Sequence, residues 1–193
     1  MTTNVTVSEH SKKIQKPQGF TIWMTGLSGS GKSTLAGELK RRFELDYARF
    51  VEILDGDEIR KGLSRDLGLS REDREEHARR VSYLAKVLSR NGVISIVALI
   101  SPYKVSRQSA RETIGGDRFV EVYIKASLAA CEKRDPKGLY AKARKGEITN
   151  MTGIQDPYEP PEYPDITIET EIGSPEESAD LLIRRLKDMN HLS

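Results

Sequence analysis

A chain of 193 residues with 37% hydrophobic content is long enough to bury one sizeable core, so we expect one domain. Its 31 Lys and Arg residues nearly cancel its 29 Asp and Glu residues, and a net charge of +2 argues against a nucleic-acid-binding protein. The longest apolar run, residues 93–100, is too short to cross a bilayer, and the single cysteine, Cys131, favours a reducing compartment. We therefore expect a cytoplasmic protein that binds neither nucleic acid nor membrane.

Apolar and polar segments alternate along most of the chain. Residues 1–18 are polar and lack a hydrophobic period, so we expect a flexible leader ahead of a single domain at residues 19–193. Five short apolar runs rich in strand-forming residues follow, at residues 20–25, 50–54, 93–100, 119–124 and 166–168. Amphipathic stretches separate these runs, and the alternation predicts an α/β fold in which crossover helices join parallel strands.

Two helices are predicted with defined ends. Within residues 71–90 apolar side chains recur at helical spacing, and Asn91-Gly92 should end that helix. Ser174-Pro175-Glu176-Glu177 offers a Ser N-cap, Pro at the first helical position and Glu at the third, so the last helix should begin there. Three leucines should pack this last helix against the sheet: Leu181, Leu182 and Leu186.

A glycine-rich motif follows the first predicted strand. Gly26-Leu27-Ser28-Gly29-Ser30-Gly31-Lys32-Ser33 matches G-x-x-x-x-G-K-[ST], and Thr34 continues it into a predicted helix. Glycines let backbone N–H groups surround phosphate oxygens, and the helix N-terminus adds its positive dipole end. Lys32 supplies charge to the β- and γ-phosphates, and the Ser33 hydroxyl suits Mg²⁺. A glycine-rich turn without a ligand is the alternative, but the position between strand and helix favours nucleotide binding, with ATP and Mg²⁺ as the expected ligands.

Two carboxylates follow the second predicted strand. Asp55-Gly56-Asp57 leaves that strand at the edge where open parallel sheets bind ligands. The spacing of i and i+2 would put both carboxylates on one side of an extended chain. Asp55 can then hold Mg²⁺, while Asp57 orients an attacking hydroxyl and accepts its proton. The alternative is a polar turn in which an aspartate caps a helix.

A basic segment at residues 135–163 is punctuated by glycine and proline and shows no clear apolar face. Segments of this length without regular structure are usually functional or disordered. The segment follows the fourth predicted strand, which predicts a lid that closes over ATP and excludes water; a plain solvated surface is the alternative for most of its charges. Arg134, just before it, is a candidate for stabilising charge on the transferred phosphate.

These motifs together resemble the adenylyl-sulfate kinases over residues 19–163. The matching stretches are 26–34, 55–63, 66–70, 73–74, 100–103 and 134–140. The resemblance implies a P-loop NTPase-type three-layer fold, with a five-stranded parallel sheet, helices on both faces and a mobile lid, usually found as a homodimer. It also implies transfer of the ATP γ-phosphoryl group to the ribose 3′-hydroxyl of adenosine 5′-phosphosulfate (APS), which gives ADP and 3′-phosphoadenosine 5′-phosphosulfate in sulfate assimilation.

The resemblance also implies substrate contacts. It puts five residues against the sulfated nucleotide: Arg60, Arg74, Ile100, Ser101 and Lys137. Two guanidinium forks suit the phosphate and sulfate of such a ligand. Ser101 resembles a serine that accepts a phosphoryl group in some members, although direct transfer needs no such intermediate and favours a positioning role.

Three substrate-binding positions depart from the family pattern. His77 replaces the usual asparagine, and Leu69 and Met151 stand where phenylalanines often stack on adenine. An imidazole can still hydrogen-bond a ligand, and aliphatic or thioether contact would replace aromatic stacking. These changes bear on substrate affinity more than on the type of reaction.

Two other functions remain open from the sequence. A kinase of the same fold could act on another hydroxyl, such as that of shikimate, gluconate or a nucleoside, although the pair Arg60 and Arg74 favours the sulfated nucleotide. A non-catalytic regulatory domain could bind the product nucleotide. The intact Lys32 and Ser33 argue against it, because binding alone does not need the apparatus of phosphoryl transfer.

Overall fold

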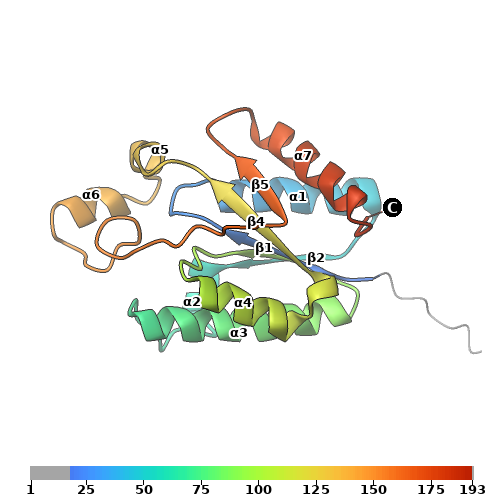
Figure 1. The fold of residues 1–193 in the computed structure, drawn as a ribbon, viewed down its shortest axis with the longest axis horizontal. Coiled ribbons are helices and arrows are strands. Elements are labelled where there is room, and N and C mark those ends of the chain that lie inside the picture. Colours follow the sequence, from blue (N-terminus) through green and yellow to red (C-terminus); the bar gives the residue numbers. More distant parts are fainter. Residues whose placement is uncertain (1–17, 193) are drawn as a thin grey trace, which may run out of the picture.

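The computed structural model describes residues 18–192, so the leader expected at residues 1–18 lies outside the described part of the chain except for Gln18. Within that part, five strands form one all-parallel sheet in the order β2-β3-β1-β4-β5 (Figure 1). The strands are β1 (Thr21–Thr25), β2 (Val51–Asp55), β3 (Ile94–Ala98), β4 (Phe119–Lys125) and β5 (Ile166–Glu169). The five predicted strands and their parallel arrangement are therefore confirmed.

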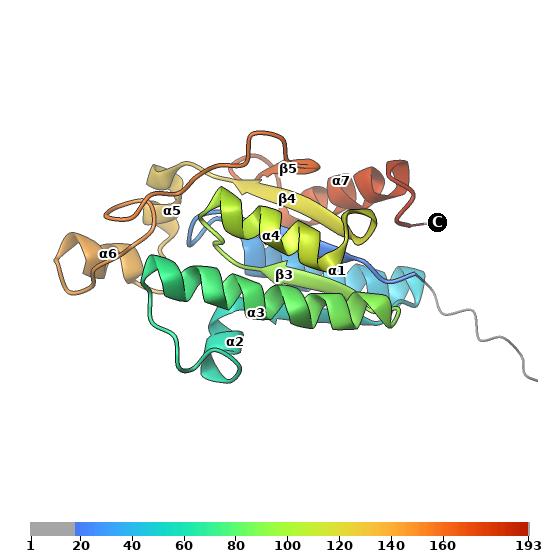
Figure 2. The ribbon, with the colours of Figure 1, turned by 60° about the horizontal axis from the view of Figure 1, so that its bottom comes forward.

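Helices cover both faces of the sheet and complete a three-layer fold (Figure 2). They are α1 (Lys32–Tyr47), α2 (Gly56–Lys61), α3 (Arg71–Arg90), α4 (Lys104–Ile114), α5 (Leu128–Arg134), α6 (Leu139–Arg144) and α7 (Pro175–Asp188), with a 3-10 turn at Gly116–Arg118. Helices α1 and α7 pack together on one face of the sheet, and α3 and α4 pack together on the other. The α/β class and the P-loop NTPase-type layering are thus confirmed.

An apolar core lies against each face of the sheet. Successive residues of β1 alternate between the two cores: Ile22 and Met24 pack on the side of α1 and α7, and Trp23 packs on the side of α3 and α4. All three side chains are fully buried. Because helices cover both faces, the strands are continuous apolar runs in the sequence instead of alternating ones.

Both predicted helix ends are confirmed. Helix α3 spans Arg71–Arg90 with Asn91 as its C-cap. Helix α7 has Pro175 at its first position, and Ser174 and Glu177 form a reciprocal capping box at its start. Each side chain of the box satisfies a backbone N–H that the helix itself leaves unpaired.

The prediction that Leu181 packs against the sheet is wrong. Leu182 and Leu186 are fully buried, whereas Leu181 is 41% exposed. Adjacent residues of a helix point about 100° apart, so Leu181 and Leu182 cannot both face the same sheet. The buried stripe of α7 instead recruits Ala179 and Ile183 at helical spacing from Leu182 and Leu186.

Residues 135–163 contain an apolar face, contrary to the prediction from their sequence. Tyr140 and Ala143 of α6 are buried together with Met151 and with Cys131 of α5. Leu27 of the glycine-rich loop packs against this cluster. Three short pieces of chain contribute to the cluster, so no single stretch shows the hydrophobic period of a helix. Helices α5 and α6 project beyond the carboxyl ends of the strands (Figure 1).

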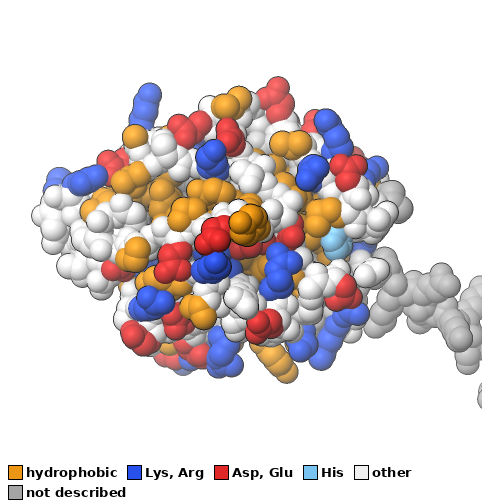
Figure 3. Space-filling model, viewed as in Figure 1, with side chains coloured by type: hydrophobic (Ala, Val, Ile, Leu, Met, Phe, Trp, Pro, Cys, Tyr) orange, Lys and Arg blue, Asp and Glu red, His pale blue; other side chains and the backbone are white. Residues whose placement is uncertain are grey.

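None of the helices within residues 18–192 is long and apolar enough to cross a membrane. On the face drawn in Figure 3, acidic and basic side chains are interspersed with one another. That face therefore carries no block of a single charge sign.

Candidate active site

A cavity of about 820 Å³ opens at the carboxyl ends of the strands. This is the edge at which open parallel sheets bind their ligands, and the volume suits a small-molecule site. Most of the residues predicted for the site line this one cavity: Ser28, Gly29, Gly31, Lys32, Ser33, Thr34, Asp55, Asp57, Arg60, Leu69, Arg74, His77, Ile100, Ser101, Arg134, Lys137 and Met151. The structure therefore brings together residues that lie more than a hundred positions apart in the chain.

Three residues of the glycine-rich motif support the loop without lining the cavity. A Cβ on Gly26 would lie 2.5 Å from the carbonyl oxygen of Ile124, so this position accepts only glycine as the chain passes β4. Ser30 is buried, and Leu27 packs into the apolar cluster around α6. Gly31, with φ of 104°, turns the chain into α1 and aims the helix N-terminus at the cavity.

The Lys32 ammonium lies at the base of this loop. Its Nζ donates hydrogen bonds to the carbonyl oxygens of Gly26 at 2.8 Å and Leu27 at 2.7 Å, and to Ser30 Oγ at 3.3 Å. Burial lowers the pKa of Lys32 from its usual value to about 8. A phosphate at the loop would stabilise the charged form and raise that pKa again. The buried cation is thus suited to an anionic ligand.

Asp55 lies next to Ser33 and meets the chemical requirements of a magnesium site. Ser33 Oγ donates to Asp55 Oδ2 at 2.8 Å, which puts a hydroxyl and a carboxylate side by side on the cavity wall. Hard oxygen ligands of this kind are the ones Mg²⁺ prefers, and few protein ligands suffice because the ion keeps several waters. The residues present therefore fit the expected metal.

The extended arrangement expected for Asp55 and Asp57 is wrong. The strand β2 ends at Asp55, and α2 starts at Gly56, so Asp57 lies in the first turn of a helix. Asp55 Oδ1 accepts a hydrogen bond from the Asp57 backbone N–H at 2.9 Å and caps that helix. The capping alternative is correct for Asp55, yet both carboxylates still line the cavity.

Lys137 reaches back from the segment before α6 to contact Asp57. Its Nζ forms an ion pair with Asp57 Oδ2. Both side chains are at least half exposed, so the ion pair itself contributes little to stability. The ion pair instead fixes a position, because it puts Lys137 of the predicted lid beside Asp57, the carboxylate predicted to act on the attacking hydroxyl.

Two arginines form one wall of the cavity. Arg60 Nη1 donates to the Gly68 carbonyl at 2.8 Å, while Arg74 donates to the carbonyls of Leu69 at 2.9 Å and Asn150 at 2.6 Å. Burial, and then the nearby charge of Arg74, lower the pKa of Arg60 from its usual value. Asp156 lies 3.9 Å from Arg74 Nη2, and the other contacts of the two guanidiniums are to backbone carbonyls. Two cations against one nearby carboxylate leave positive charge on this wall, which attracts an anion.

His77 lies at the cavity with both ring nitrogens lacking a hydrogen-bond partner. The residue is 4% exposed. Burial, followed by the positive charges of Arg60 and Arg80, lowers its pKa from 6.5 to about 4. His77 is therefore neutral at physiological pH and offers one donor and one acceptor.

The residues that replace the expected aromatic side chains both line the cavity. Met151 is buried in the cluster around α6, whereas Leu69 is 46% exposed. Met151 therefore presents a fixed surface and Leu69 a more adaptable one.

Ser101 is fixed by neighbours on every side. Its Oγ accepts a hydrogen bond from the Trp23 indole N–H at 3.1 Å, and its carbonyl accepts one from Arg107 Nη1 at 2.9 Å. The Thr25 hydroxyl binds the neighbouring Ile100 carbonyl at 2.7 Å. Ser101 is 6% exposed, so it forms a rigid part of the cavity wall.

Arg134 joins the glycine-rich loop to the turn after β5. It donates to the carbonyl of Gly29 at 3.3 Å, and to the hydroxyl and the carbonyl of Thr170 at 3.2 and 2.6 Å. Its guanidinium lines the cavity while it makes these contacts. Arg134 thus lies at the loop, as its position in the sequence predicted.

Farther along the basic segment, the charges face solvent. Lys142, Arg144 and Lys145 are exposed, and Arg144 pairs with Glu132 on α5 at 2.5 Å. For these three residues the alternative of a solvated surface is correct. The residues of the segment that line the cavity are Pro136, Lys137, Leu139 and residues 148–152.

One part of the cavity, formed by the start of α7, was not predicted from the sequence. Thr170, Gly173, Ser174, Pro175 and Ser178 line the cavity there. A signal was available, because every strand of a parallel sheet ends at the same edge and the turn after β5 had to lie there too. The capping motif at Ser174 was interpreted as a helix start alone.

Comparison with known proteins identifies the family. The family model described as adenylylsulphate kinase matches residues 18–169. A probable adenylyl-sulfate kinase of Pyrococcus abyssi is 54% identical over 176 residues, which cover 91% of this chain and 99% of that protein. The adenylyl-sulfate kinase of Halothermothrix orenii is 49% identical over 180 residues, which cover 93% of this chain and 96% of that protein.

A solved structure of an APS kinase has a similar fold. The APS kinase CysC of Mycobacterium tuberculosis, in complex with AMPPNP and APS, matches this fold with a TM-score of 0.84 at 45% identity. The match covers 89% of this chain and 99% of that one. Since the family model and these relatives span most of the sequence, the chain belongs to the adenylylsulphate kinase family.

Proposed function

We propose that this protein transfers the γ-phosphoryl group of ATP to the ribose 3′-hydroxyl of APS, which gives ADP and 3′-phosphoadenosine 5′-phosphosulfate. The observation that carries the proposal is the arrangement of the cavity. The glycine-rich loop with Lys32, the pair Arg60 and Arg74, and Asp57 all line the same cavity. A donor phosphate and an anionic acceptor nucleotide can therefore meet at a carboxylate.

On the ATP side, residues 26–34 and Arg134 bind the phosphates. Lys32 stabilises the charge that develops on the β- and γ-phosphoryl oxygens, and Ser33 with Asp55 would hold Mg²⁺. When bound, Mg²⁺ neutralises phosphate charge and keeps the γ-phosphoryl group aligned for transfer. Asp57 accepts the proton of the attacking hydroxyl, and the ion pair with Lys137 orients that carboxylate.

On the APS side, Arg60, Arg74 and Lys137 bind the phosphosulfate, and Ile100 with Leu69 and Met151 encloses the adenine. His77 supplies a neutral donor and acceptor to the same nucleotide. Ser101 orients this side of the cavity, because its hydroxyl already binds Trp23 and its backbone is anchored. Direct in-line transfer then needs no phosphoserine.

Residues 135–163 act as a lid on a single domain that spans residues 19–193. The apolar cluster around Tyr140 gives the lid its own packing, and Lys137 with Asn150 connects it to the two sides of the cavity. Closure of such a segment removes water that would otherwise compete with the acceptor hydroxyl.

A coupled assay of ADP release tests the proposed function. ADP should form rapidly when ATP, Mg²⁺ and APS are all present, and slowly when APS is omitted. Shikimate, gluconate and adenosine serve as alternative acceptors, and the nucleotide product is identified by mass spectrometry. Equal ADP release with and without APS, or faster release with another acceptor, would contradict the assignment.

The protein also acts as a homodimer in the cytoplasm, in sulfate assimilation, as the family resemblance implies. Size-exclusion chromatography with light scattering should give the mass of two chains at micromolar concentration. A mass of one chain under those conditions would argue against the dimer.

A further inference from the structure

Arg107 is a buried arginine that the proposed reaction does not use. It lies in the first turn of α4 and is 3% exposed. Its Nε donates to Glu121 Oε1 at 2.8 Å, its Nη1 to the Ser101 carbonyl at 2.9 Å, and its Nη2 to the Glu159 carbonyl at 2.8 Å. A buried guanidinium is costly unless its donors are paired, so this three-way arrangement is a specific structural feature.

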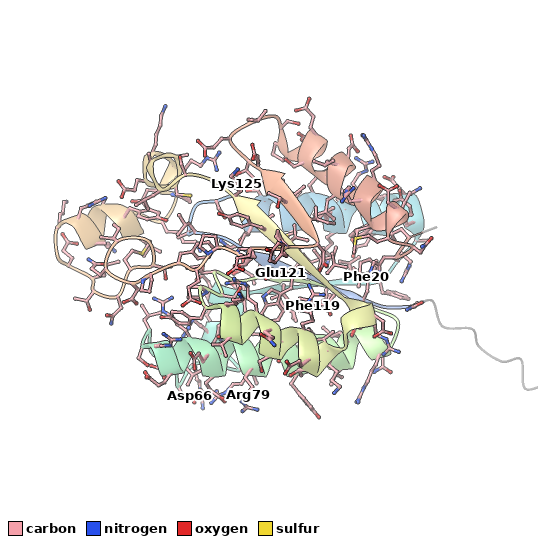
Figure 4. The ribbon with its side chains drawn as sticks, in the orientation of Figure 1. Phe20, Asp66, Arg79, Phe119, Glu121 and Lys125 are labelled. Carbon is pink, nitrogen blue, oxygen red and sulfur yellow. The ribbon has the colours of Figure 1, made fainter. Side chains whose placement is uncertain are left out.

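The three partners come from three different parts of the fold. Glu121 lies on β4 and is labelled in Figure 4. Ser101 belongs to the loop after β3 that lines the cavity, and Glu159 belongs to the C-terminal part of the proposed lid. The fork geometry of one guanidinium thus fixes the loop and this part of the lid to the sheet.

Glu159 is anchored at its other groups as well. Its backbone N–H donates to the Pro102 carbonyl at 2.8 Å, and its carboxylate accepts from the Lys104 backbone N–H at 2.7 Å. With the bond from Arg107, the residue is held to the loop after β3 and to the start of α4. Motion of the proposed lid must therefore begin on the N-terminal side of Glu159.

Ser101 needs support of this kind. Its φ of 35° is positive, a conformation that non-glycine residues adopt rarely and that persists only where the surroundings hold it. Its carbonyl accepts from Arg107 at 2.9 Å and from the Thr25 hydroxyl at 3.3 Å. Without Arg107 the main-chain support of this conformation is reduced to the longer of the two bonds.

We infer that Arg107 is a positioning residue for phosphoryl transfer, and the inference rests on the proposed function. Arg107 holds the Ser101 loop, which faces the acceptor nucleotide, and the Glu159 anchor of the lid in one fixed relative placement. It acts through these two carbonyls and not through the nucleotides themselves. A shift of about 1 Å in such a frame can cost on the order of 100-fold in rate.

Arg107→Lys is the test, because lysine keeps the charge but its single ammonium cannot reach all three acceptors. The kcat for APS should fall about 10- to 100-fold, and the KM for APS should rise while the KM for ATP stays within about twofold. A loosened lid should also admit water, so the ratio of ADP to 3′-phosphorylated product should rise above unity. KM values and this ratio do not depend on the fraction of folded enzyme, so partial unfolding cannot imitate them.

Arg111→Lys is the matched control. Arg111 lies one turn further along α4, pairs with Asp165 at 2.6 Å and covers the Phe119 ring at 4.7 Å. It shares Glu121 with Arg107, at 4.0 Å from Oε2, but it does not bond to the carbonyls of Ser101 and Glu159. This variant should lower the melting temperature while both KM values and the product ratio stay as in the wild type.

A double variant serves where Arg107→Lys does not fold. Arg107→Gln with Glu121→Gln replaces the buried ion pair by neutral amides, which removes the cost of an unpaired buried charge. It should show the same rise in the KM for APS and in the product ratio.

If wild-type values persist in a folded Arg107 variant, or if Arg111→Lys shows the same changes, the inference is overturned. If the wild type instead prefers another acceptor, the proposed function fails, and the Arg107 ratios measured with that acceptor still decide the positioning role.

Discussion

Lys32 combines burial with charge in a way that suits transfer chemistry. Lys32 lines the cavity, its Nζ is hydrogen-bonded to the carbonyls of Gly26 and Leu27, and its removal takes away little apolar packing. Lys32→Ala should therefore lower turnover on the order of 10²-fold or more while the protein stays folded. Lys40→Ala, on the same helix and paired with Glu44 at 3.6 Å, is the control and should keep full activity. Near wild-type rates for Lys32→Ala would remove the basis of the ATP assignment.

Asp55 and Asp57 should give different kinetic signatures, because metal binding and proton transfer are separate tasks. Asp55 contacts the Ser33 hydroxyl, so Asp55→Asn should weaken Mg²⁺ binding and recover part of its activity at high metal concentration. Asp57→Asn keeps the shape of the side chain and removes the proposed proton acceptor, so kcat should fall with both KM values little changed. Steady-state kinetics over a Mg²⁺ titration separates the two. Rescue of Asp57→Asn by Mg²⁺, without rescue of Asp55→Asn, would mean that the roles are reversed.

His77 should make the fold sensitive to acid. Its pKa is about 4 in the folded protein and 6.5 when unperturbed, so between these values the unfolded chain binds more protons. The stabilising effect of the neutral imidazole is full above pH 6.5 and is lost as the pH falls toward 4. Between pH 7.5 and 4.5 the wild type should lose roughly 2 kcal/mol more free energy of unfolding than His77→Asn. Urea denaturation at both pH values measures this difference, and equal losses in the two proteins would show that His77 is not the responsible group.

Helix α7 illustrates how one element divides its residues between core and solvent. Leu182 is fully buried against the sheet, whereas Leu181 is 41% exposed. Leu182→Ala should lower the free energy of unfolding by about 2–5 kcal/mol through the cavity that it leaves, and Leu181→Ala by no more than about 0.5 kcal/mol. Chemical denaturation of the pair checks this. A similar loss of unfolding free energy in both variants would contradict the division of α7 into a buried and an exposed face.

The elements that sequence predicts well are those whose signals are local. The strands are apolar runs because both sheet faces are covered, and α3 and α7 carry their own caps at Asn91 and Ser174. The α6 segment could not be recognised, because its apolar cluster forms only when Cys131, Tyr140 and Met151 meet in three dimensions. The helix cap at Asp55 was an alternative that the sequence alone could not decide. An aspartate after a strand can continue the extended chain or cap a helix, and the sequence around it is the same in both cases. Asp55 is a cap because α2 starts at Gly56.

At the scale of the whole molecule, a parallel sheet explains why most of the site was predictable. All strands end at one edge, so motifs after β1, β2 and β3 had to converge, and the structure brings Lys32, Asp57 and Ser101 to one cavity. Contacts between segments distant in sequence were not predictable in this way. The bonds that Arg107 makes to Ser101 and Glu159 have no local pattern, because two of its partners are backbone carbonyls that any residue could supply.

The arrangement of the cavity also predicts how the whole protein responds to each nucleotide. A ligand present at about 100 times its Kd raises the free energy of unfolding by about 2.7 kcal/mol, which for a chain of this size raises the Tm by roughly 5–11 °C. A non-hydrolysable ATP analogue and APS should each produce such a shift in the wild type. Lys32→Ala should lose the shift from the analogue and keep that from APS, because its charge faces the phosphate loop. Arg74→Ala should lose the shift from APS and keep that from the analogue, because Arg74 belongs to the arginine pair proposed to bind the phosphosulfate. In each variant the retained shift proves that the protein is folded, so differential scanning fluorimetry of both variants with both ligands is internally controlled. If either substitution abolishes both shifts, the cavity does not separate its two nucleotides in the way described.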